Sequence, residues 1–240
     1  MIAKFHFTFN NLEKQLSTAL EKGYTFLCCK DYVRLKKENI LPAKRIIFRV
    51  DIDLSVKKAE RLGDIFKRLD INASFFIRLH APEYNPFSFE NYRIIKKLIN
   101  NGNEIGYHSE VIDQSAIWNE DATSCLLRDI DIINRMFNIK ISGVASHGGM
   151  TGLNNLDFWK DKKPVDFGLL YEGYDKEPDY NIFQEALYIS DSEWTLWKSY
   201  NKGVLLENDR RSFEEHLADD VKTIHLLIHP DTYFNRHFYE

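Results

Sequence analysis

The stretch Arg45–Ser55, RIIFRVDIDLS, determines how the rest of the sequence is interpreted. It begins as an apolar, β-branched run, which is typical of a buried strand, and it closes on two aspartates, Asp51 and Asp53. Successive side chains of a strand alternate between its faces, so residues two apart project on the same side and these carboxylates should point together. Like charges held that close repel each other. A cation, a shared proton or full exposure to water must therefore offset the repulsion.

Outward from this stretch, strand-like and helix-like runs alternate along the chain. Apolar residues at spacings of three and four predict amphipathic helices over 10–23, 55–70, 88–102 and 119–137, the first with an asparagine cap and a closing glycine. Short apolar runs predict strands near 45–50, 72–77, 103–108, 141–146, 167–171, 186–190, 203–207 and 223–229. This alternation predicts an α/β fold with a parallel sheet, and the number of units favours a barrel over an open sheet.

Size and charge limit the classes of protein that the chain can represent. Its 240 residues, 44% of them hydrophobic and 14% aromatic, suffice for the core of one large domain over 1–240. We expect residues 1–44 to form a helical N-terminal extension packed on the barrel. The formal net charge of −4 and the pI near 6.1 predict no binding to nucleic acid or to anionic membranes, and they favour a neutral or weakly charged substrate. The oligomeric state is left open.

The cysteines and the N-terminal residues indicate a cytoplasmic protein. Cys28, Cys29 and Cys125 lack metal-binding spacing and are interpreted as buried thiols in a reducing compartment. The start, MIAKFHFTFNNLEKQL, has no apolar block of the kind found in signal peptides. No apolar run approaches the roughly 18 residues of a membrane helix, so no membrane insertion is expected.

Metal-binding and acid-base residue types recur where the predicted strands end. Barrel enzymes build their sites at the C-terminal ends of their strands, and the residues found at such ends here are Asp51, Asp53, His108, His147, Asp191 and His229. A single histidine at a strand end is more often structural, so the shared position carries the inference. Mixed carboxylate and imidazole ligands fit a divalent transition metal such as zinc, iron, cobalt or nickel better than magnesium or calcium.

Several of these residues lie in motifs that resemble a known family. The ordered set is FRVDID, NASFFIR, GNEIGYHSE, SHGG followed by NNLDFW, then YISDSEW and LLIHP. It resembles the NodB-like polysaccharide deacetylases, carbohydrate esterase family 4 in the broad sense, and is most similar to a divergent branch associated with surface-polysaccharide biosynthesis. The resemblance runs from about Arg45 to Pro230. It implies a distorted, incomplete β/α (TIM-like) barrel with one catalytic metal, which hydrolyses an N-acetyl or related acyl group on a sugar.

The resemblance also implies roles for individual residues. Asp51 matches the general base and Asp53 a metal ligand, although the family usually has these acids adjacent and Ile52 separates them here. His108 matches the first metal-binding histidine of the second motif. The late histidine that acts as general acid corresponds to His229, and Asp191 could orient it or tune its charge. The arginine-bearing third motif of the family has no clear match.

One family ligand is missing, because the second histidine of the second motif falls on Ile112. Glu110 and His147 are the alternatives for the third metal ligand. Glu110 would add another negative charge, and its chain is already leaving the strand end. His147 ends the neighbouring strand, is neutral when it coordinates and precedes two glycines that would let its loop turn towards the metal. We therefore predict Asp53, His108 and His147 as the ligands of one divalent transition metal, with zinc expected.

The sequence thus predicts a metal-dependent carbohydrate deacetylase that cleaves an amide bond. A different class stays open, namely a catalytically silent relative that binds a carbohydrate or a partner protein, since Ile112 cannot coordinate a metal. A phosphoryl-transfer enzyme is a weaker alternative because no glycine loop with phosphate-binding spacing is present. We favour the enzyme, because a decayed site would have little reason to keep acids and histidines at so many strand ends.

Overall fold

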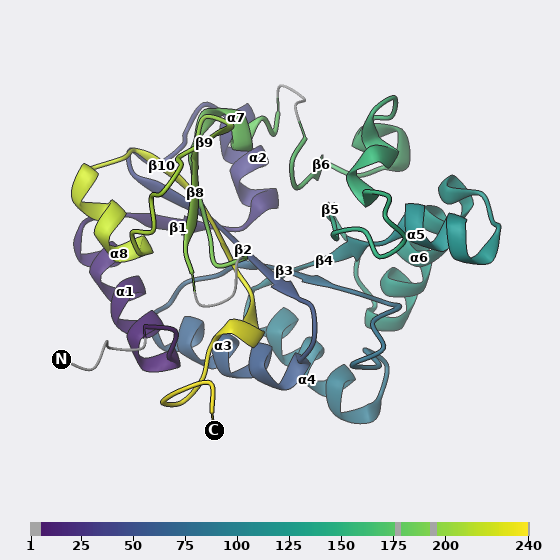
Figure 1. The fold of residues 1–240 in the computed structure, drawn as a ribbon, viewed down its shortest axis with the longest axis horizontal. Helices are drawn as coiled ribbons and strands as arrows, with labels where there is room; N and C mark the ends of the chain where they lie inside the picture. Colours follow the sequence, from purple (N-terminus) through teal and green to yellow (C-terminus); the bar gives the residue numbers. More distant parts are fainter. Residues whose placement is uncertain (1–5, 176–178, 193–195, 240) are drawn as a thin grey trace.

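A computed structural model describes residues 6–175, 179–192 and 196–239 as a mixed α/β fold with one large sheet (Figure 1). Its strands are β1 (Thr25–Leu27), β2 (Arg45–Ile52), β3 (Ser74–Ile77), β4 (Glu104–Ser109), β5 (Gly143–Ser146), β6 (Tyr171–Glu172), β7 (Leu187–Ser190), β8 (Lys198–Asn201), β9 (Val204–Leu205) and β10 (Thr223–Ile228). Its α-helices are α1 (Phe9–Glu21), α2 (Cys29–Lys37), α3 (Val56–Arg68), α4 (Phe89–Asn100), α5 (Val111–Trp118), α6 (Ala122–Phe137), α7 (Ile182–Glu185) and α8 (Phe213–His216). Short 3₁₀ helices are η1 (Asn155–Trp159), η2 (Pro164–Phe167), η3 (Leu217–Asp219) and η4 (Pro230–Thr232).

The predicted parallel sheet is confirmed for most of its strands. The strands follow the order β6-β5-β4-β3-β2-β10-β7-β8-β9, parallel from β6 to β7 and antiparallel from β7 through β9. Strand β2 is central: β10 pairs with one edge of it, while β1 and β3 share the other edge over 45–47 and 49–52. In the described ranges no pairing joins β6 to β9, so closure into a barrel is not established.

The sheet is nevertheless strongly curved, and its inner face is packed with rings. Tyr171 of β6 and Phe76 of β3 meet edge to face with ring centroids 6.3 Å apart, although two strands lie between them in the sheet. Gly106 and Gly143 on the intervening strands allow this approach, since a Cβ atom would lie 2.5 Å from the Phe76 ring or 2.2 Å from the Tyr171 ring. The curvature brings the C-terminal ends of distant strands towards one another.

The side chains of β2 alternate between the two faces of the sheet, as the sequence predicted. The main hydrophobic core, where the sheet meets the helices, takes every second residue of β2, namely Ile46, Phe48, Val50 and Ile52. Ile47 belongs to a second apolar cluster on the inner face, and Arg49 and Asp51 must share that face because they lie two and four residues on. The inner face therefore changes from apolar to charged as β2 approaches its C-terminal end.

Several local expectations differ from the structure. Thr8, rather than an asparagine, caps α1, because its side chain accepts a hydrogen bond from the backbone N–H of Asn11. The predicted strand at 167–171 is mostly a turn and irregular backbone after η2, and only its last residue enters β6. The N-terminal 1–44 region contains β1, whose three residues are too few for a periodicity signal, between α1 and α2.

Burial determines the reactivity of the cysteines. The three cysteines are free and buried, which confirms the prediction of buried thiols. Burial raises the pKa of Cys29 to about 12, so this thiol stays protonated and unreactive at neutral pH.

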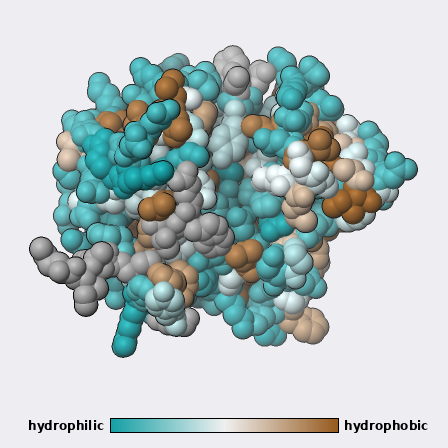
Figure 2. Space-filling view, in the orientation of Figure 1, coloured by the Kyte–Doolittle hydropathy of each residue, from teal (hydrophilic) through white to brown (hydrophobic). Residues whose placement is uncertain are grey.

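Among the described residues no helix is both long and apolar enough to cross a membrane. Figure 2 shows a largely hydrophilic surface on the face in view, with apolar side chains in scattered groups.

Candidate metal and acid-base site

The charge repulsion expected at the end of β2 is offset in part by an arginine of the same strand. The Arg49 guanidinium donates from Nε and Nη2 to the two carboxylate oxygens of Asp51, at 2.8 and 2.7 Å, and both side chains are buried. Burial alone would raise the pKa of Asp51, but the charges of Arg49 and His108 hold it below its ordinary value. Sequence reasoning missed Arg49, although a charged residue within an apolar strand, two positions before Asp51, was a visible signal.

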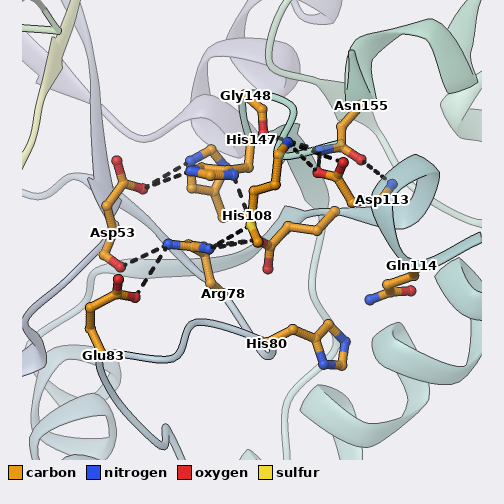
Figure 3. Close-up of polar contacts among 12 residues, drawn as sticks. Asp53, Arg78, His80, Glu83, His108, Asp113, Gln114, His147, Gly148 and Asn155 are labelled. Carbon is orange, nitrogen blue, oxygen red and sulfur yellow. Dashed lines mark hydrogen bonds and ion pairs between the residues drawn. The ribbon is translucent and has the colours of Figure 1, made fainter. Parts of the chain in front are cut away.

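The second aspartate lies within a cluster that could hold a metal ion. Ligand atoms of Asp53, His108 and His147 all lie within 4.8 Å of one another. The Nε2 atoms of His108 and His147 lie 3.3 and 3.9 Å from the same oxygen of Asp53, Oδ1, and Figure 3 shows both rings directed at this carboxylate. Asp51 borders the cluster, since its Oδ2 is also 3.3 Å from Nε2 of His108. One carboxylate and two imidazoles form a donor set suited to zinc or a similar transition metal.

A hydrogen bond at the ring nitrogen that faces away from Asp53 fixes the orientation of His108. Its Nδ1 lies 2.8 Å from the carbonyl oxygen of Ala145, and because a carbonyl can only accept, Nδ1 carries the proton and donates it. Nε2 is thereby directed towards the carboxylates. Burial would lower the pKa of His108, but Asp51 and Asp53 outweigh burial and raise it. A metal cation would compete with the second proton for Nε2, so metal binding should release that proton.

His147 follows β5, and its imidazole is suited to coordination. Burial, together with the nearby His108 and Arg78, lowers the pKa of His147, which keeps the ring neutral. Glu110, the alternative third ligand, is already held by Arg78, whose Nε and Nη2 donate to Glu110 Oε1 at 3.0 and 2.7 Å. Ile112 is partly buried against the hydrophobic core. The geometry thus groups His147, rather than Glu110, with the other two candidate ligands.

A histidine–aspartate pair lies on the other side of Asp53. His229 follows β10, and its Nδ1 lies 2.6 Å from Oδ1 of the buried Asp191, which also accepts the backbone N–H of His229. Its Nε2 lies 3.8 Å from Oδ2 of Asp53, whereas the contacts of the other two histidines are to Oδ1. Burial would lower the pKa of His229, but the carboxylate of Asp191 outweighs burial and raises it to about 9. His229 is therefore protonated at neutral pH.

The turn that carries Asp53 is anchored by two residues from the loop after β3. The Tyr84 hydroxyl donates to the carbonyl oxygen of Ile52 and accepts the backbone N–H of Arg78, both at 2.8 Å. Arg78 also donates from Nη1 to the carbonyl oxygen of Asp53 at 3.2 Å (Figure 3). Sequence reasoning gave no role to Arg78, although it ends the quoted motif NASFFIR.

Asp231 anchors the same turn from the opposite side. Its Oδ2 accepts the backbone N–H of Leu54 at 2.9 Å, and burial raises its pKa to about 6. Asp231 and Asp53 line one small cavity of about 50 Å³ together with Asp191, Ser192, His229 and Thr232. Asp231 was also missed, although it lies two residues after His229 and directly follows the motif LLIHP.

The loop after His147 is fixed to α5 by a buried hydrogen-bond cluster (Figure 3). Asp113 accepts hydrogen bonds from the backbone N–H groups of Met150 and Thr151 and from the side-chain amide of Asn155. Asn155 in turn accepts the backbone N–H of Asp113 at 3.1 Å. These bonds leave little freedom to the glycine-containing loop, so it presents His147 in one position. Sequence reasoning gave no role to Asp113 or to Asn155, although Asn155 lies in the quoted motif NNLDFW.

The structure brings together the side chains that the sequence singled out at separate strand ends. Asp53 lies at the centre, with Asp51, His108 and His147 on one side and His229 with its partner Asp191 on the other. The last two residues of the motif YISDSEW, Glu193 and Trp194, lie outside the described residues.

Comparisons with known proteins give limited information. No family profile matches the chain, and no curated protein matches it. Among solved structures it is similar to the Streptococcus pyogenes deacetylase PplD in complex with acetate, with 17% sequence identity and a TM-score of 0.43. The match covers 57% of this chain and 61% of the deacetylase, so it spans about three fifths of that protein's length. At this degree of likeness, a function must be inferred from the residues of the site themselves.

Proposed function

We propose that the protein is a metal-dependent hydrolase that removes an N-acetyl or similarly small acyl group from a sugar or sugar derivative. The observation that carries this proposal is the convergence of His108 and His147 on one oxygen of Asp53, with His229 at its other oxygen. Sequence resemblance to the polysaccharide deacetylases supports the carbohydrate substrate and a place in surface-polysaccharide biosynthesis. We assign the metal, zinc or a similar ion, to Asp53, His108 and His147.

Each part of an amide hydrolysis has a residue in this site. A divalent cation bound there would polarise the acyl carbonyl and lower the pKa of a water molecule towards neutrality. Asp51 is placed to take the proton of the attacking water, and Arg49 keeps it ionised. His229, protonated and held by Asp191, gives a proton to the sugar nitrogen as the carbon–nitrogen bond breaks. The products are a carboxylic acid and a free amine.

A small cavity of about 50 Å³ lies beside Asp53. Asp53 and His229 both line this cavity, so a group seated in it would contact a proposed metal ligand and the proposed acid together. This supports bond cleavage at this point of the site.

Metal-dependent release of acetate tests the proposal. We expect the purified protein to release acetate from oligomers of N-acetylglucosamine, to lose this activity after chelation and to recover it when zinc or cobalt is added back. Acetate is measured enzymatically, and the free amine is measured in parallel to show that an amide was cleaved. Binding of the oligomer without any acetate release by the metal-loaded protein would instead favour the catalytically silent, carbohydrate-binding alternative.

The Asp191–His229 pair predicts a pH dependence of the reaction. The donor must be protonated, so turnover should fall as the pH rises through the pKa of His229, which Asp191 raises. Asp191→Asn removes the nearby negative charge, and the decline should then move to lower pH by about one to two units, the usual effect of an adjacent opposite charge. The measurement is kcat against pH for both proteins. An unchanged alkaline limb in Asp191→Asn would exclude His229 as the titrating acid.

A further inference from the structure

A buried ion pair lies directly behind the candidate metal ligands. Arg78 and Glu110 are 4% and 2% exposed, and both hydrogen bonds from the guanidinium reach the same carboxylate oxygen, Oε1. The other oxygen, Oε2, is buried and has no hydrogen-bond partner among the described residues. A buried carboxylate oxygen without a donor is costly, so it calls for an explanation.

The neighbouring histidine has an unpaired atom of the complementary kind. Nδ1 of His147 lies 3.5 Å from Oε1 of Glu110, and it too is buried without a hydrogen bond in the described part of the chain. The other ring nitrogen, Nε2, is the one directed at Asp53. Arg78 fills two of the roughly four acceptor positions of the Glu110 carboxylate, so this side chain can still accept a hydrogen bond from the adjacent ring nitrogen.

His108 shows the effect of a hydrogen bond at the ring nitrogen that faces away from the metal site. Its Nδ1 donates to the carbonyl oxygen of Ala145 at 2.8 Å, which leaves Nε2 as the free lone pair and fixes the plane of the ring. A metal-binding histidine usually needs such an acceptor for its other nitrogen, and a carboxylate in this place also makes the ring a stronger ligand. Nδ1 of His147 has no hydrogen bond to a carbonyl oxygen of any described residue, and the Glu110 carboxylate is the acceptor beside it.

We propose that Glu110 is a positioning residue for His147: it accepts the Nδ1–H hydrogen bond, directs Nε2 at the metal and is not itself a ligand. This inference rests on the metal site of the proposed function. Arg78 completes the arrangement, because it holds Glu110 through Oε1 and donates from Nη1 to the carbonyl oxygen of Asp53 at 3.2 Å. One guanidinium thus fixes the surroundings of two of the three ligands.

A double-mutant cycle on zinc affinity separates this role from direct ligation. Zinc dissociation constants are measured by competition with a chromophoric chelator for the wild type, Glu110→Ala, His147→Ala and the double variant. Loss of a hydrogen-bond partner of a metal-binding histidine weakens metal binding by about 10- to 100-fold, so we expect this loss for Glu110→Ala. In the His147→Ala background, removing Glu110 should change the affinity no further, because Glu110 acts through that histidine.

Two results would overturn the inference while leaving the metal site intact. The first is wild-type affinity in Glu110→Ala, and the second is an equal loss on removing Glu110 with and without His147, which would make Glu110 a ligand. Failure of the wild type to bind zinc would overturn the proposed function and this inference with it.

Should Glu110→Ala not fold, Glu110→Gln is the replacement variant, because it keeps the side-chain volume. We expect a several-fold loss of zinc affinity and an altered visible spectrum of the cobalt-loaded protein. Unchanged values of both would overturn the inference.

Glu104, the first residue of β4, offers a matched control for Glu110, which directly follows the last residue of that strand. It is also a buried carboxylate, 3% exposed, but its hydrogen bonds come from Ser74, Tyr171 and the backbone N–H of Lys30, at the opposite end of β4. Glu104→Gln should lower thermal stability and leave zinc affinity unchanged. An equal loss of zinc affinity in Glu104→Gln and Glu110→Gln would show a general effect of losing a buried carboxylate, and it would overturn a specific role for Glu110.

Discussion

Replacing Asp51 with asparagine should leave the metal bound and lower turnover by about 10²- to 10⁴-fold, the usual contribution of a positioned general base. The amide cannot take a proton from the attacking water at neutral pH. Asp53, His108 and His147 are unchanged in this variant, so metal content after dialysis should match the wild type. The measurements are kcat for acetate release and zinc per chain by elemental analysis.

Asp53→Ala is the matched variant for this experiment, and it should lose both metal and turnover. The comparison is needed because Nε2 of His108 lies 3.3 Å from an oxygen of each aspartate, so this distance alone does not distinguish base from ligand. The partners of Asp51 do suggest a distinction, because Arg49 occupies both of its oxygens. If Asp51→Asn releases the metal while Asp53→Ala retains it, the two assigned roles are reversed.

Loss of Asp51 could also disturb the fold, which requires its own control. Arg49 is buried, and removing one member of a buried ion pair typically costs about 3–5 kcal/mol because the remaining charge is uncompensated. Asparagine retains an acceptor oxygen for the guanidinium, so a smaller loss is expected. Thermal unfolding and near-ultraviolet circular dichroism of Asp51→Asn would show whether low turnover arises in a folded protein.

Replacing His108 with alanine should lower zinc affinity by at least about 100-fold, since even loss of a hydrogen-bond partner behind a ligand costs 10- to 100-fold. Only Asp53 and His147 would remain of the proposed ligands, too few for a tight hydrolytic zinc site. Deacetylation should be lost in parallel. Isothermal titration with zinc measures the affinity directly, without dependence on turnover.

His80→Ala is the control for this variant. His80 lies outside the ligand cluster (Figure 3). Its Nε2 contacts the buried Asp129 at 3.1 Å. Its removal should leave zinc affinity unchanged. Unaltered zinc binding in His108→Ala would contradict the assigned site, and equal losses in both histidine variants would indicate that the zinc binds elsewhere or only to unfolded protein.

The sequence by itself predicted where the site residues lie along the chain. Strands have a period of two and parallel strands end at a common edge, so Asp51, His108 and His229 could each be placed at a strand end from local pattern alone. The four long amphipathic helices were predicted on similar grounds. Strand β1, with three residues, and helix α5, with little apolar periodicity, gave no comparable signal.

Tertiary structure decided which of these residues meet and how they are held. Arg78 and Glu110 lie 32 positions apart, and the contact between Asp191 and His229 spans 38 positions. Local periodicity contains no information on such separations. Contacts of the same kind support His147, which the sequence already favoured, over Glu110 as the third ligand, because Arg78 binds Glu110 while Nε2 of His147 is directed at Asp53.

The curvature of the sheet is likewise a property of packing between distant strands. In the sequence, Gly106 and Gly143 are only small residues within predicted strands. The structure shows that they leave room for the rings of Phe76 and Tyr171 to meet. The ion pair between Asp51 and Arg49 depends on both the local sequence pattern and the tertiary structure. Strand alternation puts Arg49 on the correct face, and burial on the inner face of the curved sheet makes their ion pair necessary, because an isolated carboxylate there would be left without water.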